Sequence, residues 1–216
     1  MKTLFIEAKY KGKIDFSGIK VNELPKKIGL ATNVQFADCI DSVKKFLEQK
    51  KKEVFTAKGN QKYECQILGC DVSAAEKVKD KVDAFLYIGD GRFHPIGIFT
   101  KTKKDVFCFN PITSEFKKLE KFVVENYEKR KKTALIKFYS ADNVGILIST
   151  KQGQRFCSDK LKNIEKKYKD KKFYKFVFDV LDVKQLENFP FIKAWINTAC
   201  PRIEEDFIVL NIGDLK

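Results

Sequence analysis

Short apolar runs alternate along this chain with segments of helical periodicity, and this alternation constrains the fold more than any other feature of the sequence. We expect strands at residues 4–6, 28–32, 54–57, 66–69, 84–88, 106–109, 145–149, 174–178 and 194–197. Such alternation favours parallel βαβ units. The sequence therefore predicts an α/β protein built on parallel sheets.

Three helices are expected where apolar residues recur at helical spacing. The first follows the second apolar run and places Phe36, Ile40, Val43 and Leu47 on one face. A long helix is expected over about 115–139, with residues 116, 119, 123 and 127 on its stripe. A third carries Cys157, Leu161, Ile164 and Tyr168 at the same spacing.

The order of these elements repeats. The run at 28–32 leads into a helix start that contains a glutamine and later reaches Cys70, and the run at 144–150 leads in the same way to Cys200. We interpret the chain as two related α/β units, each with one such cysteine. The boundary is expected near residues 110–113, where Thr113 or Ser114 can cap the long helix.

The composition is that of a soluble globular protein, with 216 residues of which 44% are hydrophobic and 33% charged. No apolar stretch approaches the roughly 18 residues of a membrane span, and the N-terminus lacks the apolar core of a signal peptide. Six cysteines without a secretory signal indicate a reducing compartment. We therefore expect a cytoplasmic protein with free thiols or metal ligands.

The net charge of +14 raises the question of a nucleic-acid partner. Only four of the 43 basic residues are arginines, although arginine's bidentate fork is favoured at phosphates. We interpret the charge as a generic lysine-rich surface and do not expect nucleic acid as the partner. An RNA-associated α/β protein is the competing hypothesis, with the basic and aromatic stretch at 166–174 as its main support.

The six cysteines differ in their positions. Three lie on helix stripes or inside a strand and are expected in the core: Cys39, Cys108 and Cys157. Cys70 and Cys200 each end an apolar run and precede residues that stop a strand, so they are expected at the carboxyl edge of a sheet, where ligands bind. Cys65, at the start of the run that Cys70 ends, would lie about 17 Å away along an extended strand. Burial is the alternative for Cys70 and Cys200.

Two thiols at such edges suggest a shared metal site. Zinc normally takes four ligands at close spacing, such as C-x-x-C pairs, which this sequence lacks, and His94 is its single histidine. Iron–sulfur clusters take thiolates, and three thiolates on a four-iron cluster leave one iron open for substrate. Cys70 and Cys200 suit that arrangement without completing it.

At these residues the chain resembles the archaeal diphthamide synthase family, the 2-(3-amino-3-carboxypropyl)histidine synthases. The matching segments occur in family order and cover essentially the whole chain; they are 4–8 (LFIEA), 28–35, 66–70 (QILGC), 86–98 (LYIGDGRFHPIGI), 149–154 (STKQGQ) and 197–203 (NTACPRI). GDGRFHP and TACPR are the most specific of them.

This resemblance implies three homologous α/β domains, each supplying one cysteine to a 4Fe-4S cluster. In the family the cluster reduces S-adenosylmethionine and breaks its sulfur–Cγ bond. A 3-amino-3-carboxypropyl group then passes to one histidine of translation elongation factor 2. By the same resemblance, Cys70 and Cys200 are the ligands of the second and third domains.

The chain departs from the family pattern because it lacks nearly all of the first domain and that domain's cysteine. Residues 1–27 then represent a remnant of the first domain and a linker, 28–112 the second-type domain and 113–216 the third-type domain. Phe36 also stands where the family commonly has a histidine. We expect either a separate chain that supplies the missing domain or a homodimer. A non-catalytic subunit of the same pathway is the alternative.

Four polar residues in the matching segments are candidate substrate ligands: Asp90, His94, Gln154 and Arg202. Gln154 lies at a helix start and Arg202 carries a bidentate guanidinium, so both suit a carboxylate such as that of S-adenosylmethionine. Each residue also has a structural alternative: a tight turn for Asp90, a turn anchor for His94, a helix cap for Gln154 and a surface ion pair for Arg202.

Overall fold

The computed structural model describes residues 4, 6–154, 158–205 and 207–215. Its helices and strands, in chain order, are β1 Lys27–Thr32, α1 Ile40–Gln49, β2 Glu53–Phe55, α2 Ser73–Glu76, β3 Ala84–Ile88, α3 Phe93–Thr102, β4 Asp105–Asn110, β5 Glu115–Lys118, α4 Lys121–Ser140, β6 Asn143–Ser149, α5 Ser158–Lys167, β7 Lys172–Phe178, β8 Ala194–Asn197 and β9 Leu210–Asn211. Short 3₁₀ helices include Val34–Cys39, Val183–Asn188 and Pro201–Glu205. Within this described part of the chain, no helix combines the length and apolar character needed to cross a membrane.

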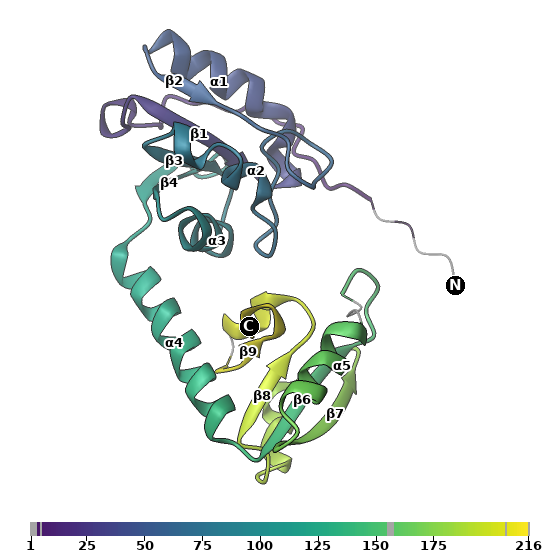
Figure 1. The fold of residues 1–216 in the computed structure, drawn as a ribbon. Helices are drawn as coiled ribbons and strands as arrows, with labels where there is room; N and C mark the ends of the chain where they lie inside the picture. Colours follow the sequence, from purple (N-terminus) through teal and green to yellow (C-terminus); the bar gives the residue numbers. More distant parts are fainter. Residues whose placement is uncertain (1–3, 5, 155–157, 206, 216) are drawn as a thin grey trace. The chain divides into compact units, whose positions relative to one another are not determined.

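Two compact units make up the chain, Met1–Val124 and Glu125–Lys216, hereafter the first and second units (Figure 1). The first contains a sheet with strand order β2-β1-β3-β4-β5, in which β5 alone is antiparallel to its neighbour. The second contains a wholly parallel sheet with strand order β7-β6-β8-β9. The predicted α/β class with two parallel-dominated sheets is confirmed.

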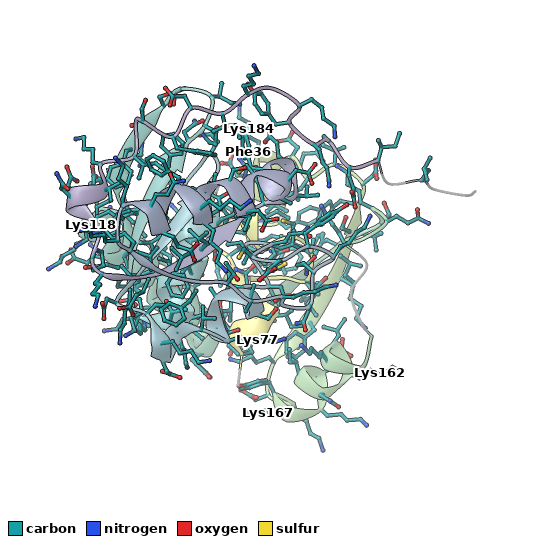
Figure 2. All side chains as sticks on the ribbon, turned by 90° about the horizontal axis from the view of Figure 1, so that it is seen from above. Phe36, Lys77, Lys118, Lys162, Lys167 and Lys184 are labelled. Atoms are coloured by element: carbon teal, nitrogen blue, oxygen red, sulfur yellow. The ribbon has the colours of Figure 1, made fainter. Side chains whose placement is uncertain are left out.

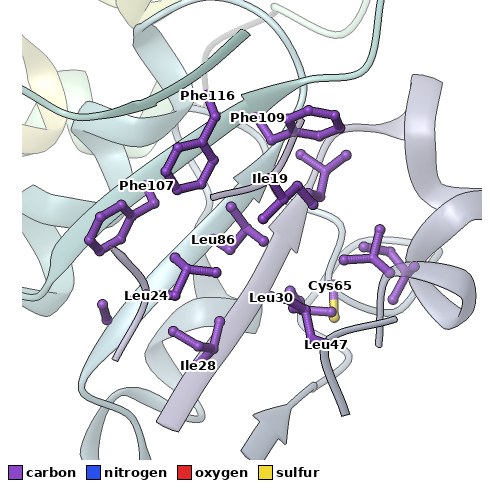
Figure 3. Close-up of a cluster of buried hydrophobic side chains, with 14 of the residues drawn as sticks. Ile19, Leu24, Ile28, Leu30, Leu47, Cys65, Leu86, Phe107, Phe109 and Phe116 are labelled. Carbon is purple, nitrogen blue, oxygen red and sulfur yellow. The ribbon is translucent and has the colours of Figure 1, made fainter. Parts of the chain in front are cut away.

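The first sheet is buried on both faces, as its continuous apolar strands require. Phe36, which precedes α1, and Leu47 of α1 pack on one face with Leu30 and Leu86. Figure 3 shows Leu30, Leu47 and Leu86 in this cluster. A separate cluster on the other face includes residues of α2 and α3, with Ile98 fully buried. The predicted apolar face at residues 36, 40, 43 and 47 is confirmed because all four side chains are buried.

In the second unit, one face of the sheet is covered by α4 and α5. Phe138 of α4 and Leu161 and Ile164 of α5 pack against Ile146 and Ile196 of the central strands. Leu161 and Ile164 confirm the predicted stripe of the third helix, whereas Cys157 lies outside the described residues.

The expected helix at 115–139 is wrong at its start, because residues 115–118 form β5 and α4 begins at Lys121. Ser114 turns with a φ of 56°, and Phe116 then pairs with Phe109, which buries its ring in the first unit. The two compact units divide after Val124; the boundary between family domains, expected near residue 112, stays a prediction. Tertiary pairing outweighed the helical spacing of residues 116 and 119.

Two further predicted strands do not appear among the described residues, which leave out Phe5. Leu4 and Ile6 lie outside any strand and are 83% and 84% exposed. Residues 66–69 form isolated bridges and a turn in place of a continuous strand. The 17 Å separation expected between Cys65 and Cys70 assumed that strand and no longer applies.

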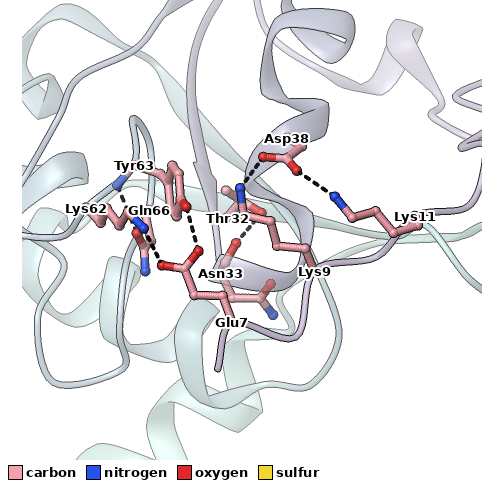
Figure 4. Close-up of polar contacts among 9 residues, drawn as sticks. All are labelled: Glu7, Lys9, Lys11, Thr32, Asn33, Asp38, Lys62, Tyr63 and Gln66. Atoms are coloured by element: carbon pink, nitrogen blue, oxygen red, sulfur yellow. Dashed lines mark hydrogen bonds and ion pairs between the residues drawn. The ribbon is translucent and has the colours of Figure 1, made fainter. Parts of the chain in front are cut away.

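Side-chain hydrogen bonds and ion pairs hold Glu7 and Lys9 against other parts of the first unit (Figure 4). The Tyr63 hydroxyl donates to Glu7 Oε2 at 2.5 Å, and Lys62 Nζ lies 2.9 Å from Glu7 Oε1. Lys9 Nζ forms an ion pair with Asp38 at 2.5 Å and lies 3.9 Å from the centre of the Tyr63 ring. The segment before β1 is therefore anchored by side chains from the 3₁₀ helix Val34–Cys39 and from the loop that carries residues 62 and 63.

Lysines dominate the exposed polar surface, as the composition predicted. Lys77, Lys118, Lys162, Lys167 and Lys184 are all exposed (Figure 2). They come from elements of both units and therefore form no single stripe along one helix or loop.

Candidate functional site

Both sheets have a topological switch point at their carboxyl edge. In the first unit, β2 lies on one side of β1 and β3 on the other; in the second unit, β7 and β8 flank β6 in the same way. Connections that leave a central strand in opposite directions open a crevice at its carboxyl end, where open α/β sheets bind ligands.

A pocket of about 450 Å³ occupies this edge in the second unit. Three of the sequence-predicted site residues line it together: Gln154, Cys200 and Arg202. Gln154 follows β6, and the other two follow β8. Cys200 and Gln154 are half-buried, whereas Arg202 is exposed. The fold therefore gathers residues nearly fifty positions apart around one cavity.

The pocket has a polar and an apolar side. Lys151 and Arg202 supply positive charge, and Asp179 supplies negative charge. The apolar lining consists of Phe178, Val180, Leu181, Val183 and Ile203. A ligand with a carboxylate, an ammonium and a short apolar chain would match these groups.

Asp179 was missed by the sequence analysis. It directly follows β7, and the Thr150 hydroxyl donates to its Oδ1 at 3.3 Å. The available signal was its position at the end of the 174–178 run, which places it at the same sheet edge as residues that end the neighbouring strands.

Backbone and side-chain hydrogen bonds fix the loop that carries Cys200. The Thr198 hydroxyl donates to the Leu147 carbonyl at 2.7 Å, which attaches the loop to β6. Asn197 Nδ2 donates to the Cys200 carbonyl at 2.9 Å, and the Ala199 amide donates to Asn197 Oδ1 at 2.9 Å. The half-buried thiol thus sits on a loop whose backbone is bonded on both sides.

Cys70 occupies the carboxyl edge of the first sheet. Leu68 and Asp71 exchange backbone hydrogen bonds of 2.9 and 3.1 Å, so Gly69 and Cys70 form the tip of a tight turn. The backbone of Thr32, at the end of β1, bonds to residues 65 and 67. The turn therefore lies beside the end of β1, and its cysteine is exposed, as the edge position predicted.

The turn rests on the start of α3. A Cβ atom on Gly69 would lie 1.8 Å from Phe93 Cε1, so only glycine allows this contact. Asp71 accepts hydrogen bonds from the Ser73 amide at 3.0 Å and from Gln61 Nε2 at 2.9 Å. Desolvation opposes ionisation of Asp71, but these hydrogen bonds prevail and lower its pKa.

Asp90 and His94 belong to the first unit, and neither lines the second-unit pocket. Asp90 is exposed and accepts from Asn110 Nδ2 at 3.2 Å, in a turn where Gly91 has a φ of 78°. The His94 ring stacks on Tyr87 with centroids 5.6 Å apart. These contacts support the structural roles of a turn for Asp90 and a turn anchor for His94. The His94 ring also contacts the Phe93 ring, against which Gly69 of the Cys70 turn packs.

The other described cysteines are poor metal ligands. Burial raises the pKa of the Cys39 thiol to about 11 and that of the Cys65 and Cys108 thiols to about 12. Thiolates, not thiols, bind metals, so these three residues favour the protonated, non-coordinating form. This distinguishes them from Cys70 and Cys200, which face solvent or a pocket.

The donor set fits an iron–sulfur cluster in kind but not in number. Cys70 belongs to the first unit and Cys200 to the second. Within the ranges that the structure describes, no three His, Cys, Asp or Glu side chains are grouped closely enough to hold a metal ion. A third thiolate is needed for a cluster that keeps one iron open.

Residues 1–207 match the family described as "Putative diphthamide synthesis protein". The 2-(3-amino-3-carboxypropyl)histidine synthase of Pyrococcus horikoshii is 30% identical over 192 residues, which are 87% of this chain and 54% of that protein. The Schizosaccharomyces pombe protein named subunit 1 of this synthase is 26% identical, over 94% of this chain and 48% of its own length. The chain thus spans about half the length of the relatives it matches.

A solved structure gives the same relationship. The crystal structure of Dph2 from Pyrococcus horikoshii with a 4Fe-4S cluster matches with a TM-score of 0.77 and 29% identity, over 91% of this chain and 58% of that one. Because the match covers 91% of this chain, the likeness includes both α/β units.

Proposed function

This chain belongs to the diphthamide synthesis protein family, and on that basis we propose that it acts in the first step of diphthamide formation. The proposed reaction transfers a 3-amino-3-carboxypropyl group from S-adenosylmethionine to a histidine of translation elongation factor 2 in the cytoplasm. The observation that carries this proposal is the second-unit pocket, in which Cys200, Gln154 and Arg202 come together beside Lys151 and Asp179.

The residues of the pocket match the methionine part of S-adenosylmethionine. Arg202 and Lys151 would bind its carboxylate, and Asp179 would bind its ammonium, because ionised hydrogen-bond partners are the strongest available. Gln154 offers an amide that can donate to the same carboxylate. The apolar lining residues would exclude water from the carbon chain that is to be transferred.

Cys70 and Cys200 are the proposed ligands of a 4Fe-4S cluster. When bound, such a cluster supplies the electron that cleaves the sulfur–Cγ bond of S-adenosylmethionine. This chain would hold two of the irons through the thiolates of its cysteines. It would orient the sulfonium through the contacts that bind the carboxylate. Support for the cluster comes from the crystal structure of Dph2 from Pyrococcus horikoshii with a 4Fe-4S cluster.

We propose that a partner chain supplies the third thiolate. A relative in Schizosaccharomyces pombe is named subunit 1, which supports a synthase made of different chains. Residues 28–112 would then act as the second-type domain and 113–216 as the third-type domain. A homodimer is the competing arrangement, and it must bring a third cysteine to each cluster.

Anaerobic reconstitution tests the cluster ligands. The full chain is mixed with iron, sulfide and a candidate first-domain partner, and iron content and S-adenosylmethionine cleavage are measured. Cys70→Ala and Cys200→Ala should each lower bound iron by about half or more and abolish cleavage, because a cluster left with fewer thiolates is lost. Cys39→Ala is the matched control, since that thiol is held protonated.

Either of two results would contradict the proposal. One is a wild-type chain that gains no iron–sulfur cluster with any such partner. The other is diphthamide formation that persists in Cys70→Ala and Cys200→Ala variants; that outcome would instead identify the chain as a non-catalytic subunit of the same pathway.

A further inference from the structure

Asn197 makes more hydrogen bonds than a residue that merely ends a strand requires. Its Oδ1 accepts from the Ala199 amide at 2.9 Å, the ordinary contact of an asparagine that starts a turn. Its Nδ2 group donates twice, to the Cys200 carbonyl at 2.9 Å and to Asn211 Oδ1 at 2.8 Å. The side chain is only 1% exposed, so water cannot replace these bonds.

Asn211 continues this arrangement on the neighbouring strand. It pairs directly with Asn197 in the register of β8 and β9 and is itself buried. Asn211 Nδ2 donates to Glu204 Oε2 at 2.6 Å. The amide of Asn197 is thereby held with its nitrogen toward the Cys200 carbonyl, because Asn211 presents an oxygen to it.

The two cysteines are held differently. The Cys70 turn is closed by backbone bonds between Leu68 and Asp71, and the Asp71 side chain bonds to Ser73 and Gln61. At Cys200, one buried side chain bonds to the peptide groups on both sides of Ala199–Cys200. The position of the Cys200 backbone therefore depends on Asn197.

We propose that Asn197, oriented by Asn211, is the positioning residue of Cys200 and sets its thiolate for metal binding. This inference rests on the proposed function, in which Cys200 is a cluster ligand. A neutral amide suits the task, since it donates to a carbonyl without bringing a negative charge toward the thiolate. Asn197→Asp would keep the bond from the Ala199 amide, lose both donated bonds and bury a carboxylate.

Cysteine alkylation of the cluster-free full chain tests the positioning. The native protein is treated with iodoacetamide, and the rate at each cysteine is read from peptide mass spectra. In Asn197→Ala, the rate at Cys200 should rise about tenfold or more because the loop opens locally. The rate at Cys70 should stay unchanged, and the buried Cys65 and Cys108 should remain protected. Asn188→Ala, an exposed site in the same unit, is the matched control.

An unchanged rate at Cys200 would overturn the inference. So would equal increases at Cys65, Cys108 and Cys200, which would indicate general unfolding. Asn211→Ala leaves the Asn197 bond to the Cys200 carbonyl possible, so the alkylation rate at Cys200 should rise by a smaller factor. If the rate at Cys200 stays unchanged in this variant, as is expected for Cys70, the result would count against the proposal.

A second readout connects the loop to the cluster. With the partner chain present, Asn197→Ala should bind less iron and alter the electron paramagnetic resonance spectrum of the reduced cluster, whereas Asn188→Ala should not. A wild-type spectrum in Asn197→Ala would overturn the positioning role. If the wild-type chain itself gains no cluster, the proposed function fails, and alkylation still decides whether Asn197 holds the loop.

Discussion

Glu204 is a carboxyl group that the second unit holds partly out of water. Burial raises its pKa to about 7, and the nearby Asp214 adds to this effect. Hydrogen bonds from Tyr127 and Asn211 and the charge of Lys131 act in the opposite direction. Lys131 also forms an ion pair with Asp214, so two acidic groups share one cation here.

This pKa predicts how stability depends on pH. The folded state binds the Glu204 proton more tightly than the unfolded chain does, so protonation of Glu204 adds to the free energy of unfolding. This contribution is fully present below about pH 4.5 and is lost as the pH rises to about 7. Glu204→Gln should remove this decrease in the free energy of unfolding with rising pH. We expect the decrease to be about 1 kcal/mol, because solvent still reaches the group.

The measurement is urea unfolding at several pH values, followed by the fluorescence of Trp195, the single tryptophan, which lies in the second unit. Glu125→Gln, an exposed site on α4, serves as the control. A pH dependence that is unchanged in Glu204→Gln would contradict the assignment.

At the scale of elements, α4 shows how tertiary burial selects which apolar residues matter. Phe138 is fully buried against the second sheet, whereas Ile136 on the same helix is 59% exposed. Helix residues two apart do not share a face, which explains the difference.

Phe138→Ala should therefore destabilise the second unit by about 3–5 kcal/mol through lost burial and a cavity. Ile136→Ala should change the free energy of unfolding by no more than about 0.5 kcal/mol. Chemical unfolding monitored through Trp195 compares the two variants, and similar losses from both would show that α4 packs in another orientation.

The two cysteine-bearing segments occupy different places in two similar sheets. The backbone of residues 65–67 bonds to Thr32 on the side of β1 opposite β3, which is the side of β2. Cys70 thus lies on the side of β1 where β2 pairs. Cys200 follows β8, which is the third strand of its sheet along the chain. The repeated order in the sequence indicated the related units but concealed this difference, because the strand expected before Cys70 is broken into bridges.

At the scale of the whole molecule, the net charge of +14 predicts weak, non-specific attraction to nucleic acid. Binding that depends on lysine–phosphate contacts falls steeply as salt displaces the released counterions. We expect RNA binding at about 50 mM salt to become undetectable at about 150 mM, as measured by fluorescence anisotropy of a labelled oligonucleotide. Binding that persists at the higher salt would favour the RNA-associated alternative.

The sequence by itself determined the α/β class, the cores of both sheets and the edge positions of Cys70 and Cys200. These features follow from local spacing: apolar runs define buried strands, and residues that end such runs reach the carboxyl edge. Gln154 and Arg202 were instead predicted from the segments that resemble the family, because a helix start and a bidentate guanidinium both suit a carboxylate.

Only the tertiary structure decided what those edges contain. The end of β7 brings Asp179 to the pocket of Cys200, Gln154 and Arg202, and β9 brings Asn211 to Asn197. The pairing of Phe116 with Phe109 turned the expected start of a helix into β5. Local spacing carries no information about which distant strand lies alongside, and these contacts depend on that choice. The residues that surround the cysteines therefore depend on strand order, whereas the position of the cysteines at a sheet edge could be predicted from the local sequence.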